Sequence, residues 1–144
     1  GLGARLDNLQ AAVLIIKLKR YNKVINMRQA AAERYNKILN GLIKSPVVKS
    51  YNTSVWAQYS IRIPLRDVIK SKLKEQGIPS AVYYPIPLHL QNCFKYLGYK
   101  IGDLPVSEKV SKEIISLPLN PYITKDEQKF IVKKLKKCLQ KDLH

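Results

Sequence analysis

The sequence contains few of the residues that most often build metal sites and catalytic triads. Its 144 residues include only two histidines, two cysteines and one methionine, and one of the histidines is the last residue. Cys93 and Cys138 lie too far apart for a close-spaced metal motif, and two cysteines do not make the disulfide framework of a small secreted protein. We therefore predict no metal site, and we expect both cysteines to be buried, reduced hydrophobic residues.

Long hydrophobic runs are also missing. The longest run, residues 11–16, ends at Lys17, well short of the roughly 18 residues that a membrane span needs. No segment has the composition of a secretory signal. We therefore expect a cytoplasmic protein with no membrane partner. Because the chain begins at Gly1, in a turn that leads into a helix, we also expect it to be part of a longer protein.

Acidic residues are scarce compared with basic ones. The chain has 10 Asp and Glu against 26 Lys and Arg, a net charge of +16. Such an excess suggests an anionic partner, so a basic module that binds nucleic acid or a membrane surface is one hypothesis. Twenty of the basic residues are lysines, and lysine lacks the planar fork with which arginine grips a phosphate or a guanine edge. We therefore favour a protein with no nucleic-acid partner and keep the basic module as an alternative.

Helices and short strands alternate in the hydrophobic pattern. Apolar residues at helical spacing predict helices at residues 8–18, 21–39, 66–76, 93–97, 105–112 and from 124 onward. Alternating or β-branched runs predict strands at residues 46–48, 55–63, 78–84 and 113–118. This order favours an α/β or α+β fold in which helices cover a small sheet. The first helix is apolar on nearly all its faces, which is typical of a buried helix.

Residues 83–91 concentrate unusual side chains. Tyr83 and Tyr84 stand together at a predicted strand end, where neighbouring side chains point to opposite faces. Pro85 and Pro87 then stiffen a loop that presents His89. A rigid loop at a strand end is a suitable place to hold a polar ligand. The alternative is structural: the tyrosines cover the sheet and His89 donates to a nearby carbonyl.

The start of the chain is the second unusual segment. Gly1 and Gly3 permit close backbone approach to a ligand or partner. Arg5 stands at a helix N-terminus, where a cation opposes the helix dipole, so a bound anion would offset it. The alternative is an ion pair of Arg5 with Asp7 or with a residue across an interface.

These segments resemble the DegT–StrS family of pyridoxal-phosphate-dependent nucleotide-sugar aminotransferases. Residues 1–12 are similar to the family's Gly-x-Asn-x-Arg-Leu/Met-Asp/Ser-x-x-Gln-Ala-Ala stretch, and residues 83–91 to its Tyr/His-Tyr-Pro-x-Pro-Leu-His-x-Gln stretch. Residues 54–59 also resemble the family. Its Leu-Gly-Tyr…Pro-x-x-Glu…Ser-Leu-Pro-x-x-Pro pattern is matched by residues 97–99, Pro105, Glu108 and residues 116–121. The resemblance covers essentially the whole chain, in order.

The resemblance implies the C-terminal part of a fold type I aminotransferase. Residues 1–40 would be a long helical segment leading from a large domain that precedes this chain, and residues 41–144 a small C-terminal α/β domain. The large domain would hold pyridoxal 5'-phosphate and the lysine that binds it, whose motif is not in this chain. The implied activity transfers an amino group from an amino acid, commonly glutamate, to a keto sugar nucleotide for polysaccharide precursors. A family dehydratase, in which histidine replaces that lysine, is an alternative.

The resemblance also assigns site residues. The family's arginine falls on Arg5, which would reach the active site of the neighbouring subunit in a homodimer. Its asparagine, which contacts the cofactor phosphate across the dimer, falls on Gly3, so Gly3 could offer only a backbone amide. Tyr83, Tyr84 and His89 would lie near the bound sugar. This chain would then supply substrate and dimer contacts but no catalytic residue, and we expect it to be inactive alone. The first helix should expose an apolar face, where the large domain and partner subunit pack.

Overall fold

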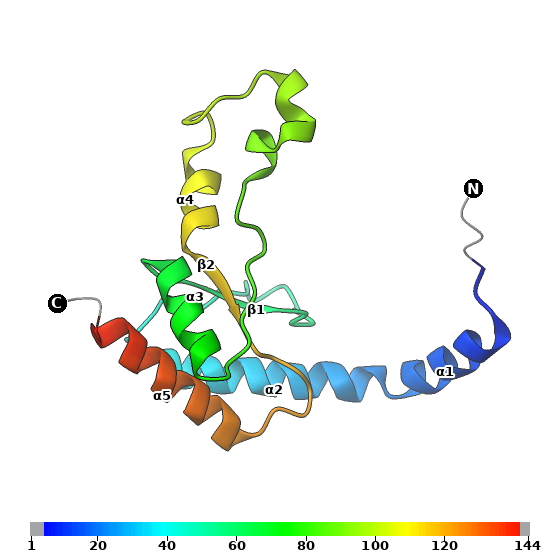
Figure 1. Ribbon diagram of the computed structural model, residues 1–144. Coiled ribbons are helices and arrows are strands. Elements are labelled where there is room, and N and C mark those ends of the chain that lie inside the picture. The colour runs from blue at the N-terminus through cyan, green and yellow to red at the C-terminus, as the bar shows by residue number, and fades with distance from the viewer. Residues whose placement is uncertain (1–4, 142–144) are drawn as a thin grey trace.

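The computed structural model describes residues 5–141. These residues form five α-helices, two short 3-10 helices (η1 and η2) and two strands. In chain order the elements are α1 (Asn8–Lys19), α2 (Tyr21–Leu39), β1 (Tyr59–Arg62), α3 (Arg66–Glu75), η1 (Leu88–Leu90), η2 (Asn92–Leu97), α4 (Pro105–Glu113), β2 (Ile114–Leu117) and α5 (Lys125–Lys141). Figure 1 shows two parts that extend from a packed centre: α1 at one end of α2, and the segment between α3 and α4. The predicted mixture of helices with a small sheet is confirmed.

The packed centre is the two-stranded sheet with α2, α3 and α5. The strands are antiparallel, and Tyr59 lies opposite Leu117 and Ile61 opposite Ile115. These four side chains are buried, because alternate residues of a strand share the face that the helices cover. Helix α5 contacts both α2 and α3, and its buried residues recur at helical spacing: Ile131, Val132, Leu135 and Cys138.

Buried polar groups fix how α2 lies against its neighbours. The side chain of Gln128 on α5 is fully buried; its Nε2 donates to the Ala31 carbonyl at 2.8 Å, and its Oε1 accepts from Arg34 Nε at 2.6 Å. Arg34 also donates to the Ile123 carbonyl at 2.8 Å. Because an unpaired polar group is costly to bury, these bonds select one arrangement of α2 and α5.

Two stacked tyrosines join α2 to β1. The rings of Tyr35 and Tyr59 lie 4.9 Å apart. The Tyr35 hydroxyl donates to the Pro118 carbonyl at 2.9 Å, and that of Tyr59 to Asn36 Oδ1 at 2.6 Å. Burial raises the pKa of both phenols, so they remain neutral hydrogen-bond donors inside the domain.

The prediction of strands was wrong in two places and too long in a third. Residues 46–48 form no strand: Val47 is 90 % exposed, and Pro46 lacks the amide hydrogen that a ladder requires. Residues 78–84 contribute only an isolated bridge between Ala81 and Ser116. The predicted strand 55–63 shortens to β1, because Trp56 has a φ of +48°, outside the extended region.

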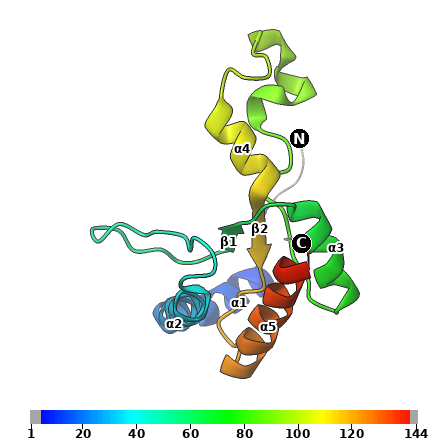
Figure 2. The same cartoon turned by 90° about the vertical axis from the view of Figure 1, so that its left-hand side faces the viewer.

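The connection from α2 to β1 forms hydrogen bonds with side chains of α2 and is not part of a sheet. Arg28 donates to the Trp56 carbonyl at 2.9 Å, and Gln29 to the Ser54 carbonyl at 3.5 Å. Figure 2 shows this connection extending away from the two strands. Side chains from α2 therefore provide partners for backbone groups that a ladder would otherwise pair.

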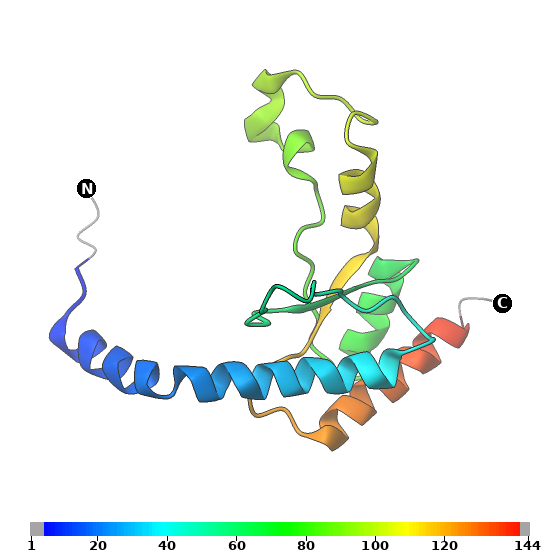
Figure 3. The ribbon, with the colours of Figure 1, turned by 180° about the vertical axis from the view of Figure 1, so that it is seen from behind.

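Helix α1 projects from the domain and buries none of its residues. Figures 1 and 3 show it continuing the line of α2 past the packed centre. The prediction of a helix buried on nearly all sides is wrong within residues 5–141, because no other element in this range covers α1. The prediction of an exposed apolar face is confirmed: Leu9 is 78 % exposed, Ile16 58 % and Leu18 67 %.

Candidate functional site

The first unusual segment lies on a projection that we call the arm, residues 83–104. The arm leaves the domain after the Ala81–Ser116 bridge, passes through η1 and η2, and returns to α4. All three ribbon views show it standing clear of α2 and α5 (Figures 1, 2 and 3). Cys93 lies in η2 and is exposed, which corrects the prediction that both cysteines are buried; Cys138, in the core, is buried as predicted.

Tyr83 and Tyr84 begin the arm and are both open to solvent. Their exposed fractions are 42 % and 69 %, and their rings meet edge to face with centroids 5.7 Å apart. Tyr83 lines a hollow together with Ser116 and Leu117 of β2, so it keeps the position beside the sheet that the structural alternative gave it, whereas Tyr84 is the more exposed of the two. Both hydroxyls are free to donate to or accept from a polar ligand.

A hollow of about 270 Å³ lies at the base of the arm beside Tyr83. Its lining includes Gln58, Ser80 and Ser116, together with apolar residues from the end of β2. Ser116 Oγ is 2.8 Å from Ser60 Oγ across the sheet. Three segments that carried the family resemblance, residues 54–59, 83–91 and 116–121, thus meet at one place. Hydroxyl and amide groups over apolar walls suit a polyhydroxyl ligand.

His89 is held inside the arm. Its side chain is only 4 % exposed, its Nε2 is 3.1 Å from Glu108 Oε1, and the ring of Tyr99 meets it edge to face. Because an ionised carboxylate only accepts hydrogen bonds, Nε2 is the donor. The structural alternative, donation to a carbonyl, is replaced here by donation to a carboxylate. Contact of His89 with a substrate stays a prediction.

Sequence reasoning named Glu108 as a motif residue but assigned it no role. Besides His89, Glu108 Oε1 accepts from the backbone amides of Gly102 at 2.9 Å and Leu104 at 3.4 Å. The Gly102 amide, with help from His89 and Leu104, lowers the pKa of Glu108. The Pro-x-x-Glu spacing of the third motif marked Glu108 as a residue of interest. Its role could not be predicted from that spacing, because it depends on how residues 83–104 fold back toward α4.

Arg5 lies apart from the arm residues. It is exposed and precedes α1, whose start is far from the arm in Figures 1 and 3. Asp7 instead caps α1 by accepting from the Gln10 amide at 2.7 Å, and residues 5–141 show no ion pair between Arg5 and Asp7. Gly3 lies outside the described residues. The structure therefore places Tyr83, Tyr84 and His89 together on the arm, whereas Arg5 lies elsewhere in the chain.

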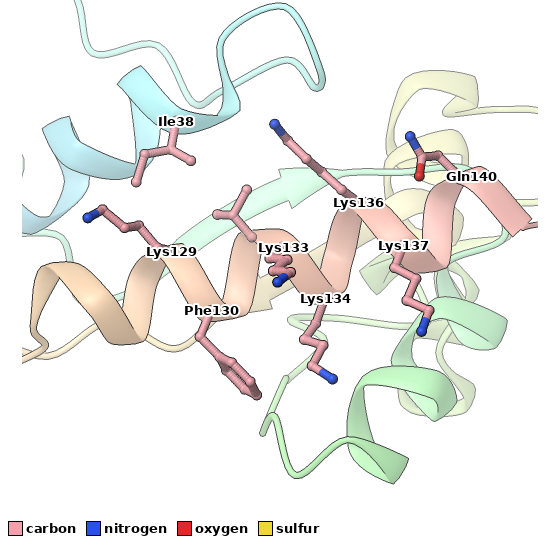
Figure 4. A pocket seen from close by; sticks show the side chains of 9 residues that line it. Ile38, Lys129, Phe130, Lys133, Lys134, Lys136, Lys137 and Gln140 are labelled. Carbon is pink, nitrogen blue, oxygen red and sulfur yellow. The ribbon is translucent and has the colours of Figure 1, made fainter.

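A second, wider hollow lies along the outer side of α5. It measures about 780 Å³ and is lined by Ile38, Phe130 and five lysines of α5. Figure 4 shows these lysine side chains spreading from the helix in several directions instead of converging on one point. Five of the 26 basic residues therefore lie on one open helix surface.

The described residues contain neither a cluster of metal-ligating side chains nor a membrane-spanning helix. In residues 5–141 no three His, Cys, Asp or Glu side chains are grouped as metal ligands would be. No helix in the same range combines the length and apolar character needed to cross a bilayer.

Comparison with known proteins connects this geometry to a family. The sequence model of the DegT/DnrJ/EryC1/StrS aminotransferase family matches residues 1–136. The chain belongs to this family. Aminotransferases of the family use pyridoxal phosphate, and solved members include forms described with that cofactor or its amine.

Individual relatives agree with the family match. A pleiotropic regulatory protein of Geobacillus stearothermophilus is 41 % identical over 94 % of this chain and 37 % of that protein. A UDP-2-acetamido-2-deoxy-3-oxo-D-glucuronate aminotransferase of Pseudomonas aeruginosa is 39 % identical over 85 % of this chain and 34 % of that protein. The crystal structure of a family aminotransferase from Brucella abortus superimposes with a TM-score of 0.86 at 41 % identity, over 96 % of this chain and 37 % of that one. The chain thus spans little more than a third of the length of these relatives.

Proposed function

We propose that this chain works as part of a pyridoxal-phosphate-dependent aminotransferase that moves an amino group from glutamate to a keto sugar nucleotide. The observation that carries the proposal is the meeting of the family motifs at the hollow beside Tyr83, in a chain that matches the family over residues 1–136. The P. aeruginosa relative is named for a nucleotide-sugar substrate. We place the whole enzyme in the cytoplasm, as a homodimer that makes polysaccharide precursors.

The arm is the part of this chain that would bind the sugar. Tyr83 and Tyr84 offer two exposed phenols, each able to donate and accept a hydrogen bond, which matches the alternating hydroxyls of a sugar ring. Gln58 and Ser116 add an amide and a hydroxyl at the hollow. These groups orient the substrate, and none of them is proposed to transfer a proton.

The residues of this chain fit a supporting role toward the cofactor. When bound, pyridoxal phosphate supplies the electron sink for amino transfer. The family resemblance gives none of this chain's lysines the role of binding the cofactor, and we assign that lysine to the remaining two thirds of the enzyme. Arg5 is an exposed guanidinium that could bind a phosphate of the neighbouring subunit's cofactor.

Substrate binding by the full-length enzyme tests this proposal. Tyr84→Phe removes one hydroxyl from the site, and we expect about three- to tenfold weaker binding of the nucleotide sugar, measured by calorimetry. Tyr122→Phe is the matched control, because Tyr122 is 73 % exposed and lies in the loop before α5, away from the arm. Equal affinity of the Tyr84→Phe variant and the control would contradict a sugar site on the arm.

A further inference from the structure

One carboxylate oxygen links the outgoing and returning halves of the arm. Glu108 Oε1 accepts from three donors: His89 Nε2 at 3.1 Å, the Gly102 amide at 2.9 Å and the Leu104 amide at 3.4 Å. His89 lies on the outgoing half of the arm, whereas Gly102 and Leu104 lie on the returning half. A single side chain of α4 therefore ties both halves together.

The contacts around Glu108 favour its ionised form. Its pKa is lowered, chiefly by the Gly102 amide, and an ionised carboxylate is a stronger acceptor than a neutral group. The His89 side chain is 4 % exposed and Glu108 12 %, so water competes little for this bond. The ring of Tyr99 covers a further side of the imidazole at 6.1 Å.

Several large side chains of the arm face solvent: Leu88 is 66 % exposed, Tyr96 79 % and Ile101 83 %. The ribbon views show the arm clear of the helices α2 and α5 that build the core (Figures 1 and 2). Because so many of its apolar side chains are exposed, polar contacts such as those of Glu108 contribute to the position of the arm.

We propose that Glu108 is a positioning residue that sets the place of the arm, and through it the placement of Tyr84 and Tyr83 against the sugar. Only four residues, two of them prolines (Pro85 and Pro87), separate Tyr84 from His89, which is bound to Glu108. Prolines restrict the backbone, so a displacement of His89 is passed on to Tyr84. The inference rests on the proposed function, because it gives the arm the role of holding sugar.

The test uses the full-length enzyme with Glu108→Ala and Glu108→Gln. The alanine variant loses all three bonds, whereas glutamine keeps one acceptor oxygen for the backbone amides. Glu75→Gln is the matched control, because Glu75 ends α3 and is exposed. Two readouts are compared: steady-state kinetics for each substrate, and hydrogen exchange at the Gly102 and Leu104 amides.

We expect Glu108→Ala to raise KM for the keto sugar nucleotide about tenfold or more, with a smaller change in kcat and none in the half-reaction with glutamate. Glu108→Gln should recover part of this loss, and the control should match the parent enzyme. Exchange at Gly102 and Leu104 should be faster in the alanine variant. A merely structural role would lower stability and affect both substrates alike.

Three results would overturn the inference: unchanged sugar KM in Glu108→Ala, equal damage to the glutamate and sugar half-reactions, or unchanged exchange at the two amides. Failure of the proposed function is seen separately, as a parent enzyme that aminates no sugar nucleotide. In that case amide exchange still decides whether Glu108 holds the arm.

Discussion

At the scale of single residues, Glu127 shows how one carboxylate fixes a helix start. Its Oε2 accepts from the Thr124 amide at 2.7 Å and from the Thr124 hydroxyl at 2.8 Å, while Thr124 Oγ1 accepts from the Glu127 amide at 3.2 Å. These reciprocal bonds form a capping box, which a Thr-x-x-Glu spacing before a helix favours. The bond from the Thr124 amide lowers the pKa of Glu127.

The lowered pKa of Glu127 predicts how its contribution to the free energy of unfolding changes with pH. Because the folded-state pKa lies below the ordinary value of 4.5, Glu127 contributes stability above that pH and loses it as the pH falls through the lowered value. We expect Glu127→Gln to unfold at lower denaturant concentration than the parent at pH 7, and the gap to narrow on acidification below pH 4.5. Glu75→Gln is the control. A gap that stays constant with pH would contradict the assignment.

Part of the candidate site could be predicted from the sequence alone. Tyr83, Tyr84 and His89 were found because two prolines and a motif mark them. The burial of His89 was not predictable, because its partner Glu108 lies 19 residues further on and meets it only after the arm closes. Gly3 and Arg5 depend on contacts between subunits, so their roles stay predictions.

At the scale of elements, helices were easier to predict than strands. The expected helices at 21–39, 66–76 and 105–112 agree with α2, α3 and α4 within one residue at each end, because helix periodicity and end signals are local. Strands depend on a partner strand, which can lie far away in the sequence. Residues 46–48 and 78–84 have β-type composition, yet only Ala81 finds a bridge.

Helix α1 carries the clearest prediction at this scale. Its exposed apolar residues Leu9, Val13 and Ile16 form a surface of the kind that marks an interface. In the full-length enzyme we expect Ile16→Glu to dissociate the dimer or lower its thermal midpoint, measured by light scattering and calorimetry. Val47→Glu, in an exposed loop, should do neither. An unaffected dimer in Ile16→Glu would show that this face is not an interface.

At the scale of the whole molecule, part of the charge of +16 lies on the open surface of α5. Five lysines of this helix line a wide hollow, but they diverge (Figure 4). We expect the double variant Lys133→Gln, Lys137→Gln to keep the enzyme's KM and kcat, and to change stability by no more than about 0.5 kcal/mol. Neither form should bind DNA or anionic vesicles at physiological salt. Salt-sensitive binding that the double variant loses would instead favour the basic module.

The central claim concerns the whole enzyme: amino transfer to a nucleotide sugar. In the most direct measurement, the full-length protein is incubated with pyridoxal phosphate, glutamate labelled with heavy nitrogen, and a UDP- or dTDP-linked keto sugar. The sugar product is then analysed by mass spectrometry. We predict a product that carries the heavy nitrogen on the sugar. A product that has lost water without gaining nitrogen, or an unchanged sugar across both nucleotide classes, would contradict the account.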